Sequence, residues 1–302
     1  MILLLLAAGM GSRYGGLKQL DTFGKHGETL MEYSVYDALR SGFDKVVFVI
    51  RSDMEQHFRV RFGCIAQTCS DIYYVFQSRQ AQHSCLDLSA ERDKPWGTVH
   101  ALLAAHEVID RPFVVANADD FYGRSAYLQM AAFLSALVPA PETGDYGTTY
   151  GMVGYGLQKV LSAFGTVARG ICQLDEQGYL QSIRELSNIV QTPQDGIVAR
   201  DTGETLLPDM LTSMNFWGFT PAIFGQMRVL FDDFLEQNAN DSKAECVLSS
   251  SVNSLLRQQA CRISVMPSEE QWLGVTYQAD KPRTEAALLQ LIAKGNYPDK
   301  LW

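Results

Sequence analysis

The sequence predicts an α/β protein with a parallel, doubly wound sheet. Apolar runs of strand length alternate with helical patterns through the first half of the chain. Two motifs, Gly9-Met10-Gly11 and Asp119-Asp120, each follow directly after such an apolar run. Because ligands bind beyond the carboxyl ends of the strands in sheets of this kind, we expect a site where the two motifs meet.

The elements of the first half follow one another in a regular order. The run 3–6 is apolar and ends at a glycine-rich turn, which indicates a buried strand. A helical pattern follows, and Gly42 is a natural helix stop. The predicted strands cover 3–6, 46–50, 72–76 and 113–116, and the predicted helices cover 30–39 and 97–108.

The second half is more mixed. Short strands are expected within 152–167 and 171–184, and the stretch 187–209, which contains prolines and glycines, is expected to form a loop or flap. No repeat or linker divides the chain, so we expect a single domain over 1–302. The remaining predicted elements are strands at 214–219 and 262–266 and helices at 221–235, 244–258 and 281–293.

Composition and charge exclude several classes of protein. The net charge is −9, and no cluster of Lys and Arg suits duplex nucleic acid. The six cysteines form no C-x-x-C pair. The apolar start lacks the basic residues of a signal peptide, and no later apolar run approaches the ~20 residues that cross a bilayer. We therefore expect a cytoplasmic protein with neither a nucleic-acid nor a membrane partner.

The first motif has the chemistry of a phosphate-binding loop. Glycines let backbone amides approach a phosphate, Arg13 can hold two phosphate oxygens, and Lys18 adds a compact positive charge. A dinucleotide pattern fits poorly because Tyr14 stands at its third glycine. The two cations therefore favour a triphosphate, although such a loop by itself could also be a structural turn.

A longer run contains this loop, Leu6-Ala7-Ala8-Gly9-Met10-Gly11-Ser12-Arg13, and Lys18 follows it. It resembles the signature of the sugar-phosphate nucleotidylyltransferases, which include thymidylyl- and uridylyltransferases that act on sugar 1-phosphates. The resemblance implies a three-layer α/β/α, Rossmann-like fold of the nucleotide-diphospho-sugar transferase type, with a mixed, mostly parallel sheet. It implies Arg13 and Lys18 as catalytic cations, and as triphosphate-binding residues it implies Leu6, Ala8, Gly9, Gly11 and Ser12.

Further stretches resemble the same family in the same order along the chain. The segment 95–101 resembles the turn that reads the base, which implies Gln77, Gly97 and Thr98 as nucleotide-binding residues. Asp119 matches the aspartate that binds magnesium. The strand 214–219 and Glu185 match the part that holds the sugar hydroxyls, which implies Glu185, Asn215 and Gly218 as substrate-binding residues.

Two positions depart from the family pattern. The second metal ligand is an asparagine or an aspartate in the family, and here the candidates are Thr276 and the nearby Asp280. The family usually has a lysine after the sugar-binding glutamate, and here Leu186 stands there. Arg184 or Arg169 could replace that lysine. The resemblance spans 3–280 and implies a nucleotide-binding half at 1–135 and an acceptor-binding half at 136–302.

The implied reaction joins a nucleoside triphosphate to a small phosphorylated molecule, such as a sugar 1-phosphate, and releases pyrophosphate. An ionised phosphate attacks the α-phosphorus in line and needs no general base. Positive charge from Mg²⁺, Lys18 and Arg13 offsets the repulsion between the two anions. The resemblance leaves a homo-oligomer open.

Three other functions remain open from the sequence. A cytidylyltransferase for phosphocholine would need an aromatic cage for the trimethylammonium group. A glycosyltransferase of the same architecture would need a D-x-D metal motif, and Ala118 interrupts the nearest candidate. A regulatory subunit would be expected to lack the cations or Asp119, and all are present. The residues that could supply the cage are Tyr150, Tyr155, Phe216 and Trp217.

Overall fold

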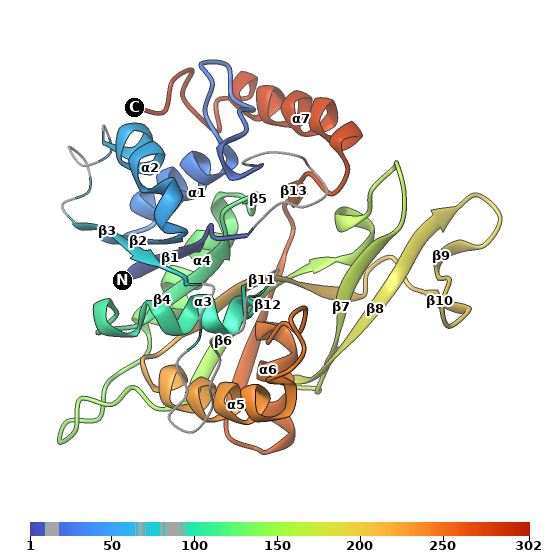
Figure 1. The fold of residues 1–302 in the computed structure, drawn as a ribbon. Helices are drawn as coiled ribbons and strands as arrows, with labels where there is room; N and C mark the ends of the chain where they lie inside the picture. Colours follow the sequence, from blue (N-terminus) through green and yellow to red (C-terminus); the bar gives the residue numbers. More distant parts are fainter. Residues whose placement is uncertain are drawn as a thin grey trace.

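A computed structural model describes residues 1–9, 18–63, 65, 69, 71–78, 81, 92 and 95–302, without the side chain of Lys18. A large mixed sheet runs through the described chain in the order β10-β9-β8-β7-β11-β4-β1-β2-β3 (Figure 1). Off this path, β6 pairs with β11 and β12 pairs with β6. The four parallel strands of the first half are β1 (Ile2–Leu6), β2 (Lys45–Ile50), β3 (Asp71–Phe76) and β4 (Phe113–Asn117).

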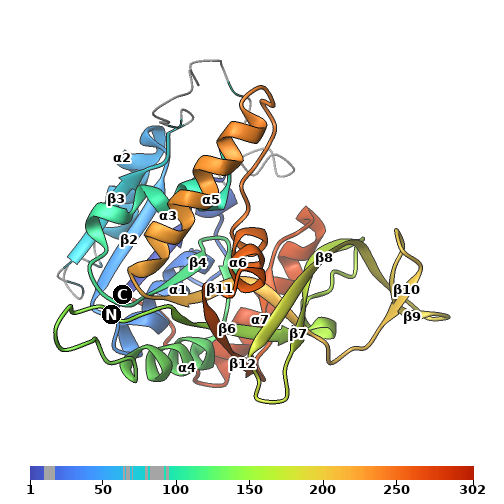
Figure 2. The ribbon, with the colours of Figure 1, turned by 90° about the horizontal axis from the view of Figure 1, so that it is seen from below.

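The second half extends this sheet mainly with antiparallel strands. The strand β11 (Leu211–Phe219) pairs with β4, so both halves share one sheet. On its other side β11 contacts β6 (Thr149–Gly156), which pairs in parallel with β12 (Arg262–Ser268). Four further strands project from the body of the molecule (Figure 2): β7 (Val167–Leu174), β8 (Leu180–Thr192), β9 (Gly196–Ala199) and β10 (Glu204–Leu206).

Helices cover both faces of the sheet because the central strands bury alternate side chains on each side. Leu3 and Leu5 of β1 belong to one apolar cluster, and Ile2 and Leu4 belong to the other. The first cluster includes residues of α1 (Leu30–Arg40), α2 (Glu55–Phe62) and α4 (Arg124–Ser135). The second includes residues of α3 (Thr98–Ala104), α5 (Ala222–Asn238) and α6 (Leu248–Arg257). The predicted three-layer α/β/α fold is therefore confirmed.

The structure corrects the prediction for 187–209. Instead of a loop or flap, most of this stretch continues β8 and forms β9 and β10, with Ile189 paired to Ala199. Alternating burial explains the difference, since Ile189 and Ile197 are buried beside the rest of the first cluster. Pro193 and Gly203 lie in the turns between these strands. The predicted helix at 97–108 is also shorter, because α3 ends at Ala104 and a 3₁₀ turn, His106–Val108, follows.

The C-terminal region packs over the segment that follows the glycine loop. A small apolar cluster joins Phe23 and Leu30 to Phe121 of β5 (Asp120–Phe121), to Leu273 of β13 (Leu273–Gly274) and to Leu288 of α7 (Lys281–Ala293). The strands β5 and β13 also pair with each other. This cluster therefore connects the chain beyond the loop with the aspartate motif.

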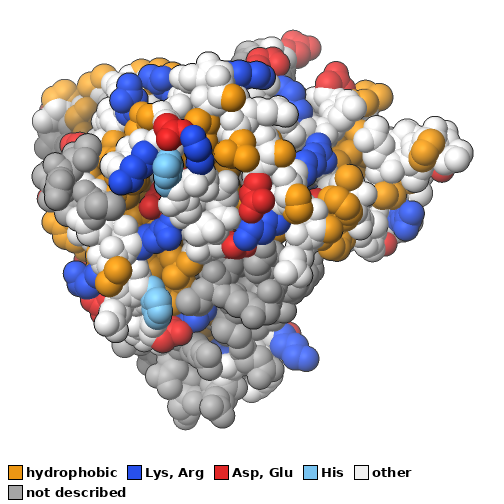
Figure 3. Space-filling view, turned by 90° about the horizontal axis from the view of Figure 1, so that it is seen from above, with side chains coloured by type: hydrophobic (Ala, Val, Ile, Leu, Met, Phe, Trp, Pro, Cys, Tyr) orange, Lys and Arg blue, Asp and Glu red, His pale blue; other side chains and the backbone are white. Residues whose placement is uncertain are grey.

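None of the helices in the described part of the chain is long and apolar enough to cross a membrane. On the face drawn in Figure 3, the described Lys and Arg side chains lie scattered among neutral and acidic ones. They form no continuous basic stripe there.

A buried carboxylate on α1 predicts a stability that depends on pH. The Tyr297 hydroxyl donates to Asp37 Oδ2 at 2.6 Å, and Oδ1 has no hydrogen-bond partner among the described residues. Burial raises the pKa of the Asp37 carboxyl from 3.8 to about 7. The folded state therefore holds a proton that the unfolded state releases above pH 4, so this contribution to stability falls as the pH rises from about 4 to 7.

We expect Asp37→Asn, which imitates the protonated acid, to reduce this dependence. Urea unfolding at pH 5 and pH 8 should give a difference in unfolding free energy smaller by about 2 kcal/mol than in the wild type. An Asp37→Asn protein with the same pH dependence as the wild type would contradict the assignment.

Candidate active site

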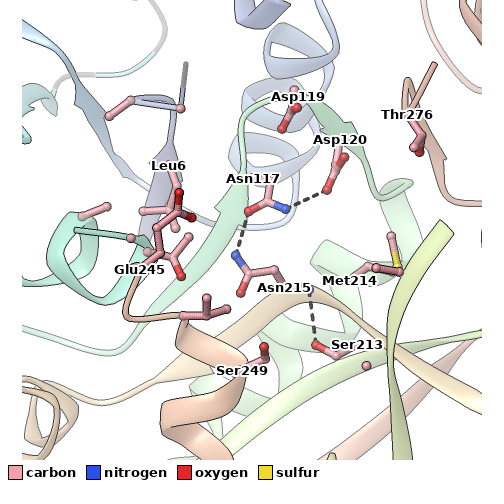
Figure 4. Close-up of a pocket in the computed structure, with 18 of the residues that line it drawn as sticks. Leu6, Asn117, Asp119, Asp120, Ser213, Met214, Asn215, Glu245, Ser249 and Thr276 are labelled. Atoms are coloured by element: carbon pink, nitrogen blue, oxygen red, sulfur yellow. Dashed lines mark hydrogen bonds between the residues drawn. The ribbon is translucent and has the colours of Figure 1, made fainter. Parts of the chain in front are cut away.

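A cavity of about 860 Å³ opens at the carboxyl ends of β1 and β4, where the sequence places the two motifs. Ala8 and Gly9 follow β1, and Asn117, Asp119 and Asp120 stand at or after the end of β4. The opposite wall comes from β7, β8, β11 and the start of α6, so both halves of the chain form the cavity (Figure 4).

A chain of amide hydrogen bonds forms the floor of the cavity. Asn117 Nδ2 donates to Asp120 Oδ2 at 2.9 Å, and Asn215 Nδ2 donates to Asn117 Oδ1 at 2.7 Å (Figure 4). Asn215 Oδ1 in turn accepts from Trp217 Nε1 at 3.0 Å. The four side chains are thus fixed relative to one another.

The backbone at Asn215 departs from a regular strand. Its φ is 60°, and the pairing of β11 with β6 shifts between Ser213 and Trp217. Asparagine adopts this left-handed region more readily than most residues, and bulges of this kind redirect side chains beside active sites. The bulge therefore lets the Asn215 amide reach Asn117.

The two aspartates of the motif have different surroundings. Asp120 is buried, and its Oδ2 accepts the Asn117 amide and lies 3.2 Å from the Tyr122 hydroxyl. Burial raises the pKa of Tyr122 well above its usual value, so its hydroxyl stays neutral. Asp119 is only partly buried and faces the cavity. Asp120 therefore supports the floor, and Asp119 is the carboxylate better placed for a ligand.

Hydrogen bonds connect the turn before α3 with the segment before α6. Gln77 Nε2 donates to the Gly97 carbonyl at 2.9 Å, and the Leu248 amide donates to Thr98 Oγ1 at 2.8 Å. The Val99 amide donates to the Cys246 carbonyl at 3.1 Å. Gly97 has a φ of 93°, and a Cβ there would lie 2.5 Å from that carbonyl oxygen. Glycine is therefore required at the turn.

Polar groups also cover the far wall. Ser249 Oγ donates to Glu185 Oε1 at 2.8 Å, and both residues face the cavity. A carboxylate beside a hydroxyl offers acceptors and a donor for the hydroxyl groups of a small polyol.

Comparison with known proteins identifies the class of enzyme. Residues 3–144 match the family model described as the MobA-like NTP transferase domain. The first half of the chain is similar to an NTP transferase domain. The protein is therefore a nucleotidyltransferase.

Solved structures share the fold over nearly the whole chain of this nucleotidyltransferase. A putative glucose-1-phosphate thymidylyltransferase from Bacillus anthracis is 10% identical, with a TM-score of 0.62 and coverage of 95% of each chain. The inositol-1-phosphate CTP transferase from T. maritima is 12% identical, with a TM-score of 0.59 and coverage of 96% of each chain. Comparison with curated proteins gives no match.

The structure brings most of the predicted site residues together in the nucleotidyltransferase. Arg13, Gly11 and Ser12 lie outside the described residues, as does the side chain of Lys18. The predicted residues that line the cavity are Leu6, Ala8, Gly9, Gln77, Gly97, Thr98, Asp119, Glu185, Asn215 and Thr276.

Two predicted site residues are not brought to the cavity. Gly218 lies in the core of β11, where a Cβ would lie 2.2 Å from Met130 Sδ, so the glycine permits close packing of α4. Asp280 is buried beside the start of α7. Its carboxylate accepts from the amides of Thr276 and Tyr277 and from Ser162 Oγ, so it caps a turn and does not face the cavity.

The prediction that four aromatic residues could form the cage of a phosphocholine enzyme is wrong. All four candidate rings are fully buried in the two apolar clusters, and none lines the cavity. Alternation along β6 and β11 places them on the helix-covered faces. The four are Tyr150, Tyr155, Phe216 and Trp217.

Sequence reasoning assigned no role to several residues of the cavity. Gln19 Nε2 donates to the Gly9 carbonyl at 2.6 Å and holds the end of the glycine loop. Asn117 stands two residues before the Asp119-Asp120 motif, and that position was the available signal. Ser213, Glu245 and Ser249 carry no motif, and only the fold brings them to the cavity.

Proposed function

We propose that this nucleotidyltransferase transfers a nucleoside monophosphate from a nucleoside triphosphate to a sugar 1-phosphate or a closely related polyol phosphate. The observation that carries the proposal is the single cavity that holds the end of the glycine loop, Asp119 and the Glu185–Ser249 pair. A triphosphate at the loop and a polyol at that pair would meet beside Asp119. The printed names of the two structural neighbours, a glucose 1-phosphate and an inositol 1-phosphate enzyme, support this acceptor class.

The reaction follows from these positions. An oxygen of the acceptor phosphate attacks the α-phosphorus, and the bond to the β-phosphate oxygen breaks on the opposite side. Arg13 and Lys18 are the residues we expect to stabilise the charge on the transferring and leaving phosphates. Glu185 and Ser249 would hold the acceptor hydroxyls, and the amide chain through Asn215 keeps the cavity floor fixed.

Two oxygen donors on the cavity wall fit a magnesium ion. The Asp119 carboxylate and the Thr276 hydroxyl are hard oxygen ligands of the kind that Mg²⁺ prefers, and Mg²⁺ usually keeps several waters and substrate oxygens besides. No cluster of three or more His, Cys, Asp or Glu occurs among the described residues. When bound, the ion supplies positive charge that offsets the repulsion between the reactants.

The test is pyrophosphate release with magnesium. The common nucleoside triphosphates are crossed with glucose 1-phosphate, other sugar 1-phosphates, inositol 1-phosphate and phosphocholine. We expect release only with both substrates, and with a sugar or polyol phosphate as the acceptor. Phosphocholine as the preferred acceptor would overturn the acceptor class. An absence of saturable triphosphate binding would overturn the proposal as a whole.

A further inference from the structure

Arg169 is a partly buried cation that no described carboxylate contacts. Its Nε and Nη2 donate to the Val160 carbonyl at 3.1 and 2.6 Å, and Nη1 donates to the Ala168 carbonyl at 2.8 Å. A guanidinium has five N–H groups, so two have no partner within the described chain. Several other described arginines form a salt bridge: Arg51, Arg59, Arg61, Arg111 and Arg184.

This missing partner matters because buried charges in proteins are normally paired. Burial lowers the pKa of Arg169 to about 10, while the charges of Asp120, Asp280 and Glu185 oppose that shift. The side chain is therefore still cationic at neutral pH. The guanidinium is close enough to feel these carboxylates but contacts none of them. It is therefore available to bind an anion that the protein itself does not supply.

Arg169 also stands at the cavity. It lines the wall on β7, and its guanidinium lies 5.3 Å from the ring of Trp272, which lines the same cavity. It is the one Lys or Arg among the described residues of the lining, which otherwise carries the acidic side chains Asp119, Asp120, Glu185 and Glu245. Among the described residues, Arg169 is therefore the positively charged side chain that an anion at this end of the cavity would contact.

The pairing of β7 with β8 explains why Arg169 can replace the lysine that the family pattern places at 186. Arg169 is the direct cross-strand partner of Leu186. Directly opposite residues of an antiparallel pair project from the same face, with Cβ atoms ~5 Å apart. Leu186 itself is buried in the first apolar cluster. The positive charge missing from β8 is thus supplied from the neighbouring strand.

The other candidate, Arg184, does not fit this role. Its guanidinium forms two hydrogen bonds of 2.6 Å with the Glu204 carboxylate on β10, outside the cavity. Its side chain is 52% exposed. Arg184 therefore holds the projecting strands together, and it provides a matched control.

We propose that Arg169 binds the phosphate of a phosphomonoester acceptor through its two remaining N–H groups, and so takes the place of the cation absent at Leu186. The assignment rests on the proposed function, since it names the acceptor end of the same cavity. One N–H remains on each terminal nitrogen, which matches the two bonds of a bidentate phosphate contact. The carbonyls of Val160 and Ala168 keep the guanidinium oriented.

The test compares Arg169→Gln, Arg169→Lys and Arg184→Gln with the wild type. With the substrate pair found by pyrophosphate release, Arg169→Gln should raise the acceptor KM about 10- to 100-fold, with the triphosphate KM unchanged. Arg169→Lys should recover part of this loss, because it restores the charge without the second N–H direction. Arg184→Gln should keep both KM values.

Calorimetric titration with glucose 1-phosphate and with glucose provides a readout that needs no turnover. We expect wild-type protein to bind the phosphate ester more tightly than glucose, and Arg169→Gln to lose that preference. Equal binding of glucose 1-phosphate by both proteins, or none by the wild type, would overturn the assignment. A wild type that binds the ester through Arg169 yet releases no pyrophosphate would instead overturn the proposed function.

Discussion

Replacing Asp119 by asparagine is expected to lower kcat for pyrophosphate release by a factor of 100 to 1,000, or about 3–4 kcal/mol. Asp119 faces the cavity from the end of β4, and its carboxylate is the one that we propose binds the magnesium–triphosphate unit. The amide keeps the size of the side chain and removes its charge, so the fold should be retained. The measurement is kcat at saturating substrates, together with the thermal midpoint.

The neighbouring aspartate is the matched control for this prediction. Asp120 receives hydrogen bonds from Asn117 and Tyr122 within the floor. Asp120→Asn puts an amide against the Asn117 amide, so we expect a loss of stability of about 1–3 kcal/mol and a smaller loss of kcat than with Asp119→Asn. If Asp120→Asn abolishes turnover while Asp119→Asn keeps the wild-type kcat, the roles of the two aspartates are reversed.

The sequence predicted the parts of this protein that depend on local pattern. Strands β1 to β4 were predicted nearly in full, because short continuous apolar runs between turns are typical of buried strands. Placing Gly9 and Asp119 at the carboxyl ends of two parallel strands then predicted the position of the cavity, since β1 and β4 are neighbours. Most of the predicted site residues followed from that geometry.

The errors arose where tertiary contacts decide the outcome. The strands β9 and β10 are short, and the prolines and glycines around them hid the burial of Ile189 and Ile197, which depends on packing against distant residues. Asp280 was a candidate metal ligand by proximity to Thr276, but its oxygens accept backbone amides. The choice between Arg169 and Arg184 depended on the cross-strand register of β7 and β8 and on the hydrogen bonds between Arg184 and Glu204. Neither could be predicted from the sequence.

The largest effect on stability is expected from Gly97→Ala. A Cβ at this position would lie 2.5, 2.7 and 2.9 Å from backbone atoms of Cys246, and the φ of 93° is unfavourable for any side chain. Backbone atoms cannot turn aside as a flexible side chain does, so the segment 244–248 must move away from the turn. We expect a loss of about 4 kcal/mol in the free energy of unfolding, from strain and overpacking together.

The same movement would break the hydrogen bonds between the turn before α3 and the segment before α6. Because we propose that this part of the cavity holds the nucleotide, a raised triphosphate KM should accompany the lost stability. Gly225→Ala is the control, because this glycine is exposed within α5 and has open space around it. There alanine should stabilise the protein by about 0.5–1 kcal/mol. Urea unfolding of both variants separates the two cases. A Gly97→Ala protein that unfolds at the wild-type midpoint would show that the contact between Gly97 and Cys246 does not hold the two halves of the cavity together.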